Sequence, residues 1–414
     1  MKTMTLIRKD REAILNKVDH LVQRKHFDPS LNGANWRELV EDWRPRILAA
    51  DTVEGLETQI SALLSRLKTS HTGFFHQSLR TIPARHAINA TCRPYASNGC
   101  SAKWMFQDVH DGGAAYKAGI RAGDLLLELN GKEVSPPSQP VFRMGCTARL
   151  TIERLSGDRA EVEISVPAPK SRKHPVNQPL AIVCSTLQPG LGLLKVTMFP
   201  GAIGIDLAHG FDRAIAALRE CDRLIVDLRG NTGGGIGGLR LMSYLTPDKR
   251  PVGYSLTKKR AASGYRREDL SQFGRIPSHK ATLLWLLIRY AFVDKSITVV
   301  TEGLGQQRFH GRIVILVNEH SASAAEMLAA FARENNLAKI VGTKTPGRLL
   351  SGSAFKVGHG FLLGLPVGAY LTWQGTLLEG KGVEPDEALD LSRDALNEGR
   401  DTQLEKAIEV VTAL

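Results

Sequence analysis

The sequence predicts a multidomain α/β protein, and three observations support this prediction. Residues 1–80 have apolar side chains at helical spacing, residues 84–168 contain short β-rich runs between turn residues, and residues 176–414 alternate strands with helices. A chain of 414 residues with 43% hydrophobic residues can bury two or three separate cores. We therefore expect an N-terminal helical region, a β-rich domain and an α/β core, in that order.

The N-terminal helical region is identified by apolar residues that recur three or four positions apart, as one face of a helix requires. They are Ile14, Val18, Leu21 and Val22, followed by Leu56, Ile60, Leu63, Leu64 and Leu67. The helical spacing stops at Ser70-His71-Thr72-Gly73. In isolation, Ser70-His71 is read as an ordinary loop or helix-cap pair.

The segment 109–132 has the turn residues of a small β domain. A short helix is expected to close at Gly119, and a turn at Gly123-Asp124 then leads into an apolar strand. The following Asn130-Gly131 favours a tight hairpin turn. These residues predict a helix, a strand and a hairpin in close succession.

This succession resembles the A-x-x-A-G-(I/L)-x-x-G-D-x-(I/L)…N-G stretch of PDZ domains. The resemblance implies that residues 84–168 form a PDZ-like domain, a module that binds chain ends by strand addition. A role as a mere spacer is the alternative. The peptide-binding loop is expected near residues 99–104, although no clean G-L-G-F pattern is present there.

A strand that leads through a serine-rich turn into a helix is the first candidate site. Residues 313–317 are apolar and mostly β-branched, and residues 324–331 read as a largely buried helix. Ser323 lies at the junction, where free backbone N–H groups of a helix N-terminus can hold an oxyanion. The alternative is a capping box of Ser323 with Glu326, which have the S-x-x-E spacing, and Ser321 is expected to be a cap.

Two further segments carry unusual residue patterns. The glycine-rich run 227–235 directly follows the apolar strand 224–226, so that backbone there can approach a ligand closely. It is not a phosphate loop, because no Gly-Lys-Ser/Thr follows and the G-x-G-x-x-G order is absent. The second segment, 378–386, reads L-E-G-K-G-V-E-P-D.

In this order, D-L-R-G-N-x-G-G, S-A-S-A-x-E and E-G-K-G-V-E-P-D resemble the core of the tail-specific (C-terminal processing) serine peptidases, over roughly residues 190–390. The resemblance implies the α/β sheet fold shared with ClpP and crotonases, with Ser323 as the nucleophile. It also implies an oxyanion hole made by the backbone N–H of Ala324 and one from Gly233 or Gly234.

One departure from this family bears on the mechanism. Tail-specific peptidases pair the serine with a lysine in a T-x-G-K segment, and the matching position here is Arg348. A guanidinium stays protonated at any usable pH, so it cannot take a proton from serine. Lys344 lies four residues earlier and is out of register. The chain has either lost catalysis or uses another base.

The tricorn-type branch of the same superfamily suggests that other base. It uses a Ser-His pair from the N-terminal region, the middle serine of the core motif and a glutamate before the closing G-V-x-P-D. Carried over by position, these are Ser70, His71, Ser323 and Glu379. Neutral imidazole can take the serine proton near pH 7 while a carboxylate orients it, here through Ser70. Glu379 alone would be read as a surface residue.

Three function hypotheses follow. The first is a serine peptidase that cleaves peptides or unfolded protein C-terminal segments, with PDZ-assisted capture. The second is a non-catalytic peptide-binding protein, which Arg348 alone supports. The third, CoA-ester chemistry on a crotonase-like fold, is weaker because the S-A-S-A helix and the PDZ-like domain have no role in it.

Composition limits the partners and the compartment. Five cysteines without C-x-x-C spacing favour buried thiols in a reduced compartment, and we expect no metal and no cofactor. No signal peptide is visible, and the longest apolar run, 283–292, is too short to span a bilayer, so we expect a cytoplasmic protein without a membrane partner.

The net charge of +12 raises nucleic acid as a possible partner. Much of the excess lies in residues 249–280, where no nucleic-acid-binding module is recognisable. We read this segment as a solvated face, with attraction of acidic peptides as the alternative, and expect peptide substrates rather than nucleic acid. A homo-oligomer is possible.

Overall fold

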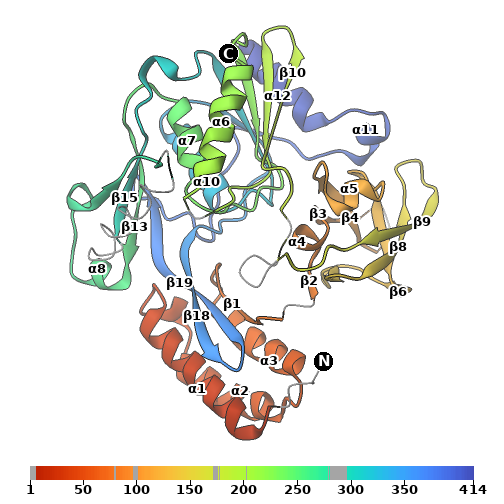
Figure 1. The fold of residues 1–414 in the computed structure, drawn as a ribbon, viewed down its shortest axis with the longest axis vertical. Coiled ribbons are helices and arrows are strands. Elements are labelled where there is room, and N and C mark those ends of the chain that lie inside the picture. Colours follow the sequence, from red (N-terminus) through yellow and green to blue (C-terminus); the bar gives the residue numbers. More distant parts are fainter. Residues whose placement is uncertain are drawn as a thin grey trace.

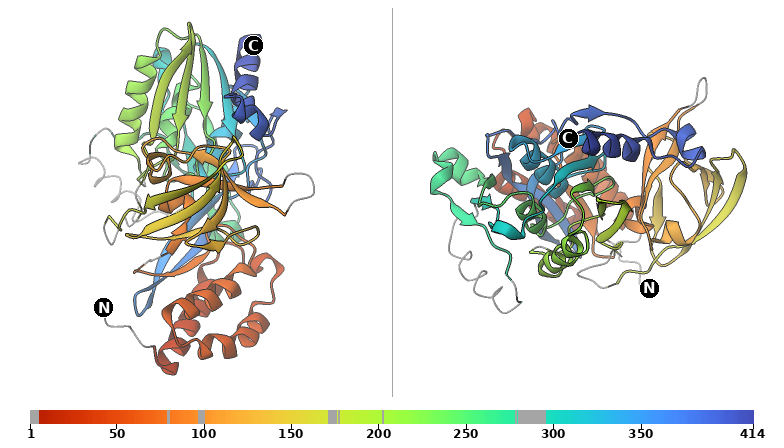
Figure 2. Two further views of the ribbon diagram at one scale, coloured as in Figure 1. Left: turned by 90° about the vertical axis from the view of Figure 1, so that its right-hand side faces the viewer. Right: turned by 90° about the horizontal axis from the view of Figure 1, so that it is seen from above.

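The computed structural model describes residues 6–78, 81–96, 101–170, 176, 178–201, 203–277, 279 and 296–414. Residues 99 and 100 of the expected peptide-binding loop, residues 278 and 280 of the basic segment and the apolar run 283–292 lie outside the described residues. The chain forms helices at one end, a β-rich domain at the side and an α/β core with a parallel sheet (Figures 1 and 2). The predicted fold class is confirmed.

The N-terminal helices pack on a long hairpin that projects from the core (Figure 1). The helices are α1 (Arg8–Lys25), α2 (Trp36–Ala49) and α3 (Val53–Ser65), and the hairpin is β18 (Leu350–Gly358) with β19 (Phe361–Thr372). Their predicted apolar faces share one core with Phe361, Leu363 and Leu365, which alternate along β19 and therefore point to the same side. Helices α1, α2 and α3 thus depend on a hairpin formed some 300 positions later.

Strand β1 (Gly73–His76) continues from these helices and adds to the same hairpin. It pairs antiparallel with β19, with Gly73 opposite Gly364. Ser70 and His71 immediately precede this strand, so the pairing holds them beside the hairpin.

The β-rich domain is a six-stranded sheet with short helices against it. Its strands are β3 (Ala90–Tyr95), β4 (Lys103–Val109), β5 (Leu125–Leu129), β6 (Lys132–Glu133), β8 (Thr147–Glu153) and β9 (Arg159–Ser165). Beside it lie α4 (Ala84–Ala87), α5 (Ala114–Lys117) and the two-stranded pair β2 (Thr81–Pro83) and β7 (Val141–Arg143). Asn130 and Gly131 have positive φ values of 53° and 73°, as the predicted hairpin turn requires.

The core sheet has the order β10-β11-β12-β16-β17-β20, in which all pairs except β10-β11 are parallel. The strands are β10 (Ile182–Gln188), β11 (Leu191–Val196), β12 (Arg223–Asp227), β16 (Arg312–Val317), β17 (Lys339–Gly342) and β20 (Glu387–Ala388). Its helices are α6 (Ile205–Ala217), α7 (Gly238–Tyr244), α10 (Ala324–Glu334) and α12 (Thr402–Ala413).

Both faces of this sheet are covered, which explains the continuous apolar run of β16. Ile313, Ile315 and Val317 pack with α6, α7 and α10, whereas Val314 and Leu316 pack with α12. A parallel sheet buried on both faces has no polar alternation. The carboxyl ends of β12 and β16 lead into the glycine-rich run and the serine turn, respectively. These two segments therefore meet at one edge of the sheet.

A second sheet completes the region of the site. It has the order β1-β19-β13-β15-β14, with β18 paired to β19. Its further strands are β13 (Pro251–Thr257), β14 (Ser271–Phe273) and β15 (Ile297–Val300). The remaining elements are α8 (Lys258–Ala262), α11 (Arg393–Asn397) and 3-10 turns at Leu31–Gly33, Arg267–Asp269 and Gly305–Gln307. Within the described ranges, no helix has the length and apolarity needed to cross a membrane.

Candidate active site

Ser323 lies at the N-terminus of α10 in an unusual backbone conformation. Its φ is 58° and its ψ is −116°, a region that a residue with a side chain occupies only under constraint. Gly233 supplies part of the constraint, since a Cβ on it would lie 2.6 Å from Ser323 Cβ and 2.9 Å from the Ala324 nitrogen. The glycine-rich run therefore packs directly against the serine turn, and only glycine fits there.

The Glu326 carboxylate fixes the backbone of the serine turn through hydrogen bonds. Its buried carboxylate accepts the backbone N–H of Ser323 at 2.9 Å, that of Gly347 at 2.6 Å and that of Arg348 at 2.8 Å, and the Thr345 hydroxyl at 2.7 Å. Burial raises the pKa of Glu326, and these four donors oppose the rise. The S-x-x-E spacing thus marks a carboxylate that ties Ser323 to the T-P-G-R segment.

Ser70, His71 and Glu379 form a hydrogen-bonded chain. Glu379 accepts the Ser70 backbone N–H at 2.6 Å on Oε1 and the Ser70 hydroxyl at 2.8 Å on Oε2, and it also accepts the Leu349 N–H at 3.1 Å. The Ser70 hydroxyl lies 2.8 Å from His71 Nδ1. With Nδ1 engaged in this way, Nε2 is the ring nitrogen left for chemistry.

His71 forms part of the cleft wall and is open to solvent on one side. Partial desolvation is the main influence on its pKa and lowers it, Glu379 opposes this, and the Arg348 guanidinium lowers it further. A lowered pKa keeps the imidazole neutral near pH 7, the state in which it can accept a proton.

A shared cleft connects His71 with Ser323. The cavity has a volume of about 480 Å³, and Gly234 and Ala324 also line it. Among the described residues, no hydrogen bond joins Ser323 to His71. Catalytic hydrogen bonds are often long without substrate and shorten when substrate binds.

The backbone N–H groups of the glycine-rich run are not equivalent. Gly233 donates its N–H to Asn231 Oδ1 at 2.8 Å, and Gly235 donates to the Phe199 carbonyl at 2.8 Å. Gly234 lies between them with φ of 139°, exposed in the cleft. Of the two glycines expected from the sequence, Gly234 is thus the one that could act with Ala324.

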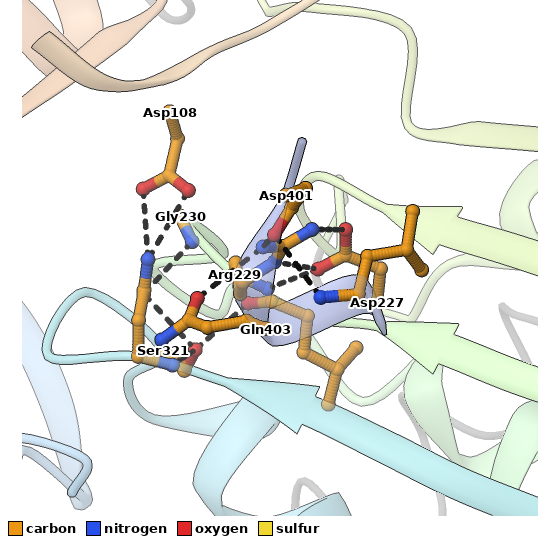
Figure 3. A network of polar contacts seen from close by, with 10 residues as sticks. Asp108, Asp227, Arg229, Gly230, Ser321, Asp401 and Gln403 are labelled. Atoms are coloured by element: carbon orange, nitrogen blue, oxygen red, sulfur yellow. Dashed lines mark hydrogen bonds and ion pairs between the residues drawn. The ribbon is translucent and has the colours of Figure 1, made fainter. Parts of the chain in front are cut away.

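A buried ion-pair network supports the glycine-rich run from the side of α12 (Figure 3). Arg229 binds Asp227 at 2.8 Å and Asp401 at 2.9 Å, and it donates to Gln403 at 3.2 Å. Burial alone would raise the pKa of Asp227, but the Arg229 guanidinium holds it below its usual value. The D-L-R-G motif therefore connects the central sheet to the C-terminal helix α12 through ion pairs and a hydrogen bond.

Sequence reasoning missed a contact between the β-rich domain and the site (Figure 3). Asp108, at the end of β4, accepts two hydrogen bonds from Asn318 Nδ2 at 3.0 and 3.1 Å. Asn318 Oδ1 in turn accepts the Gly230 N–H at 3.0 Å. No local pattern marks Asp108, because its partner is 210 positions away.

The expected role of Ser321 as a cap is wrong, since Ser323 is the N-cap residue of α10. The fully buried Ser321 hydroxyl donates to the Leu228 carbonyl and accepts the Asn318 N–H, both at 2.8 Å. It therefore links the strand end before the serine turn to the glycine-rich run.

Neither Lys344 nor Arg348 is among the residues that line the cleft. Lys344 is exposed, and its Nζ pairs with Glu384 at 2.5 Å, so it points to the surface rather than into the cleft. Arg348 is also exposed, and its backbone is fixed by Glu326.

A serine at a helix N-terminus, an imidazole backed by a hydroxyl and a carboxylate, and a cleft shared by both are the groups that serine hydrolases combine. Residues 190–389 match peptidase family S41, and residues 105–142 match the PDZ domain. The matched residues therefore belong to peptidase family S41 and to the PDZ domain, as the resemblance seen in the sequence implies.

Several curated proteins that are similar in sequence to this chain have names that refer to carboxyl-terminal processing. The chain is 22% identical over 386 residues to the chloroplastic carboxyl-terminal-processing peptidase 3 of Arabidopsis thaliana, covering 88% of this chain and 66% of that protein. It is 24% identical over 313 residues to the carboxyl-terminal-processing protease of Synechocystis, covering 73% and 63%. The chain spans about half to two thirds of the length of the curated relatives that it matches.

Solved structures share the fold. The photosystem II D1 C-terminal processing protease superposes with a TM-score of 0.57 at 19% identity, covering 97% of both chains. A CPAF mutant superposes with a TM-score of 0.64 at 17% identity, covering 98% of both chains. The tricorn protease gives 0.51 at 16% identity over 97% of this chain and 36% of its own.

Proposed function

We propose that this protein is a serine peptidase in which Ser323 is the nucleophile and His71 the general base, oriented through Ser70 by Glu379. The observation that carries the proposal is the shared cleft, because His71 and Ser323 both line it. Engagement of His71 Nδ1 by Ser70 leaves Nε2 for the Ser323 proton.

The proposed reaction follows from these positions. His71 Nε2 takes the Ser323 hydroxyl proton as the oxygen attacks the substrate carbonyl, and the N–H groups of Gly234 and Ala324 stabilise the oxyanion. The imidazolium then protonates the leaving amine, so the peptide bond breaks and an acyl-serine forms. Water, deprotonated by the same imidazole, releases the acyl part and restores Ser323.

Peptide segments at or near chain ends are the proposed substrates. The PDZ domain supports this, since such modules capture chain ends by strand addition. The names of the similar plant and cyanobacterial proteins, which refer to carboxyl-terminal processing, point the same way.

A second candidate is a peptide-binding protein without catalysis, and the observation that favours it is Arg348 in place of a lysine. The two candidates differ in whether Ser323 is activated.

A fluorophosphonate probe tests this difference, because it reacts only with an activated serine. We expect the native protein to be labelled and Ser323→Ala to be unlabelled, with hydrolysis of a casein substrate lost in parallel. Ser353→Ala is the matched control, since Ser353 lines the same cleft. If the folded native protein were not labelled, the result would support the non-catalytic candidate.

A further inference from the structure

A second cavity lies on the α/β core, apart from the cleft that contains Ser323. Its volume is about 760 Å³, a size typical of small-molecule sites, and none of its lining residues also lines the Ser323 cleft. Its walls are the C-terminal half of α6, one face of α7 and the segments 219–222 and 306–310. Helices α6 and α7 pack against each other there (Figure 1).

Arg240 on α7 lines this cavity with free hydrogen-bond donors. Its side chain is only 17% exposed, and its Nε lies 3.1 Å from Glu302 Oε2 and 3.6 Å from Asp212 Oδ1. Neither contact has the geometry of a hydrogen bond, and within the described ranges no N–H of this guanidinium donates one. Because polar groups this deeply placed normally have hydrogen-bond partners, the outer nitrogens Nη1 and Nη2 favour an acceptor in the cavity.

A second arginine of the cavity has an unpaired charge. Arg308 is half-buried, and its side chain forms neither an ion pair nor a hydrogen bond with any residue that the structure describes. The acidic residues that line the cavity, in contrast, all have partners. They are Asp212 with the Tyr244 hydroxyl at 2.7 Å, Glu220 with Arg219 at 3.0 Å and Asp222 with Arg223 at 3.2 Å.

This distribution of charge selects the kind of anion. Two guanidinium groups can hold one carboxylate through charge-assisted hydrogen bonds. The three carboxylates around the cavity remain charged, so a doubly charged phosphate would be repelled more strongly than a singly charged carboxylate. The charges therefore favour a monoanion.

The deeper wall of the cavity is apolar. Ile215, Cys221, Tyr244 and Phe309 line it, and each is at most 9% exposed. An apolar group that covers this wall removes further apolar surface from water, at about 25 cal/mol per Å². The cavity thus combines cationic donors with an apolar wall.

We propose that this cavity binds a monoanionic carboxylate with a short apolar body. The carboxylate accepts hydrogen bonds from Arg240 and Arg308, and the apolar body lies against Ile215 and Phe309. This site goes beyond the proposed peptidase function and does not depend on Ser323.

Isothermal titration calorimetry of the full chain at pH 7.5 tests the charge selection. The probe is 3-phenylpropionate, which has one carboxylate and an apolar ring, and 3-phenylpropionamide is its uncharged match. We expect the carboxylate to bind at least about 10-fold more tightly than the amide, because the amide cannot accept charge-assisted hydrogen bonds. Equal affinities, no binding of the carboxylate, or tighter binding of inorganic phosphate would each overturn the inference.

Variants locate the bound probe. Arg308→Gln removes a charge without a partner among the described residues, so the fold should persist while Kd rises about 10-fold. Arg240→Lys keeps a charge beside Glu302 but loses the planar pair of donors, and Kd should rise about 5-fold. Arg219→Gln is the matched control, since Arg219 lines the same cavity but already pairs with Glu220. An unchanged Kd for Arg308→Gln or Arg240→Lys, or an equally large rise for Arg219→Gln, would overturn the inference.

Binding in the Ser323 cleft is the remaining explanation to separate. Ile297 lines that cleft and is half-buried, so Ile297→Glu places a negative charge where a carboxylate bound there would be repelled. We expect the Kd of 3-phenylpropionate to stay unchanged in this variant, and a rise of about 10-fold would place the probe in the Ser323 cleft and overturn the inference. None of these measurements uses catalysis, so failure of the peptidase proposal is seen separately, as absent fluorophosphonate labelling.

Discussion

Ser70 donates two hydrogen bonds to Glu379, one from its backbone and one from its hydroxyl, and so occupies both oxygens of a carboxylate 309 positions away. The hydroxyl also contacts His71 Nδ1. The carboxylate therefore acts on the imidazole through one intervening oxygen, and it fixes the backbone of the same turn.

The first prediction concerns this chain of groups. His71→Ala should lower kcat/KM by about 10³-fold or more, as loss of a general base does, while Glu379→Gln should lower kcat about 10- to 100-fold with little change in KM, because it only orients. Steady-state kinetics on a fluorogenic peptide measures both. Lys344→Ala is the control and should be near wild type, since Lys344 pairs with Glu384 at the surface. An active His71→Ala beside an inactive Lys344→Ala would instead indicate a Ser-Lys pair.

The second prediction concerns pH. Neutral imidazole is the active form, so kcat/KM should rise with pH through the His71 pKa, which desolvation and Arg348 lower below the ordinary value of 6.5. Arg348→Gln removes one of the influences that lower the His71 pKa, so it should move the midpoint of the pH profile of kcat/KM to higher pH. Arg348→Lys keeps the charge and should leave both the midpoint and the rate at pH 7.5 unchanged. Identical midpoints for wild type and Arg348→Gln at low salt would show that the guanidinium does not act on the base.

The third prediction concerns the surface on which His71 lies. A Cβ on Gly352 would approach His71 Cδ2 to 3.1 Å and His71 Cβ to 3.3 Å, so Gly352→Ala should displace the imidazole by a few tenths of an ångström. We expect kcat to fall about 10-fold with KM nearly constant, and Gly352→Val to lose more.

Gly364→Ala is the matched control for this change. Gly364 also lines the cleft, but its nearest atom, the His71 carbonyl oxygen, would be 3.5 Å from the new Cβ, an ordinary contact. Its kcat should stay close to wild type. Equal kcat values for Gly352→Ala and Gly364→Ala would contradict the role given to Gly352.

The fourth prediction concerns stability. His110 is fully buried between the PDZ domain and the core, facing Arg85, Lys195 and Asp227. Burial lowers its pKa well below 6.5, so the unfolded state binds the proton more readily. The free energy of unfolding should therefore fall as pH drops below about 6.5, by at most about 1.4 kcal/mol per pH unit for this one group.

Urea unfolding at pH 7.5 and 5.0 measures this loss. His110→Gln should lose less stability between the two pH values than wild type, whereas His20→Gln, at an exposed position of α1, should behave like wild type. An equal loss in wild type and His110→Gln would show that this histidine does not contribute.

Local patterns were sufficient for much of the fold and for the candidate residues. The run 313–317 is apolar at every position because β16 is buried on both faces, and the S-x-x-E spacing at Ser323 reflects a real bond between Glu326 and the turn. Ser70 and His71 were found only through a resemblance, since a serine followed by a histidine carries no structural signal of its own.

What the sequence did not reveal depends on close approach in space. Gly352 packs against His71, and Asn231 accepts a hydrogen bond from the Gly233 N–H. Nothing in the spacing of these residues indicates either contact. The same holds for Asp108, whose partner Asn318 is in another domain. Such pairs follow from how strands end at a common edge, which a one-dimensional pattern does not contain.

The pairing of β1 with β19 also determines when the site can form while the chain is being synthesised. Gly73 meets Gly364, and 364 − 73 = 291 residues separate them, so the turn that holds His71 has no support until most of the chain has been made. The proposed base and nucleophile can therefore come together only after the hairpin β18-β19 has left the ribosome and paired with β1. A half-made chain would therefore lack the proposed pair of base and nucleophile.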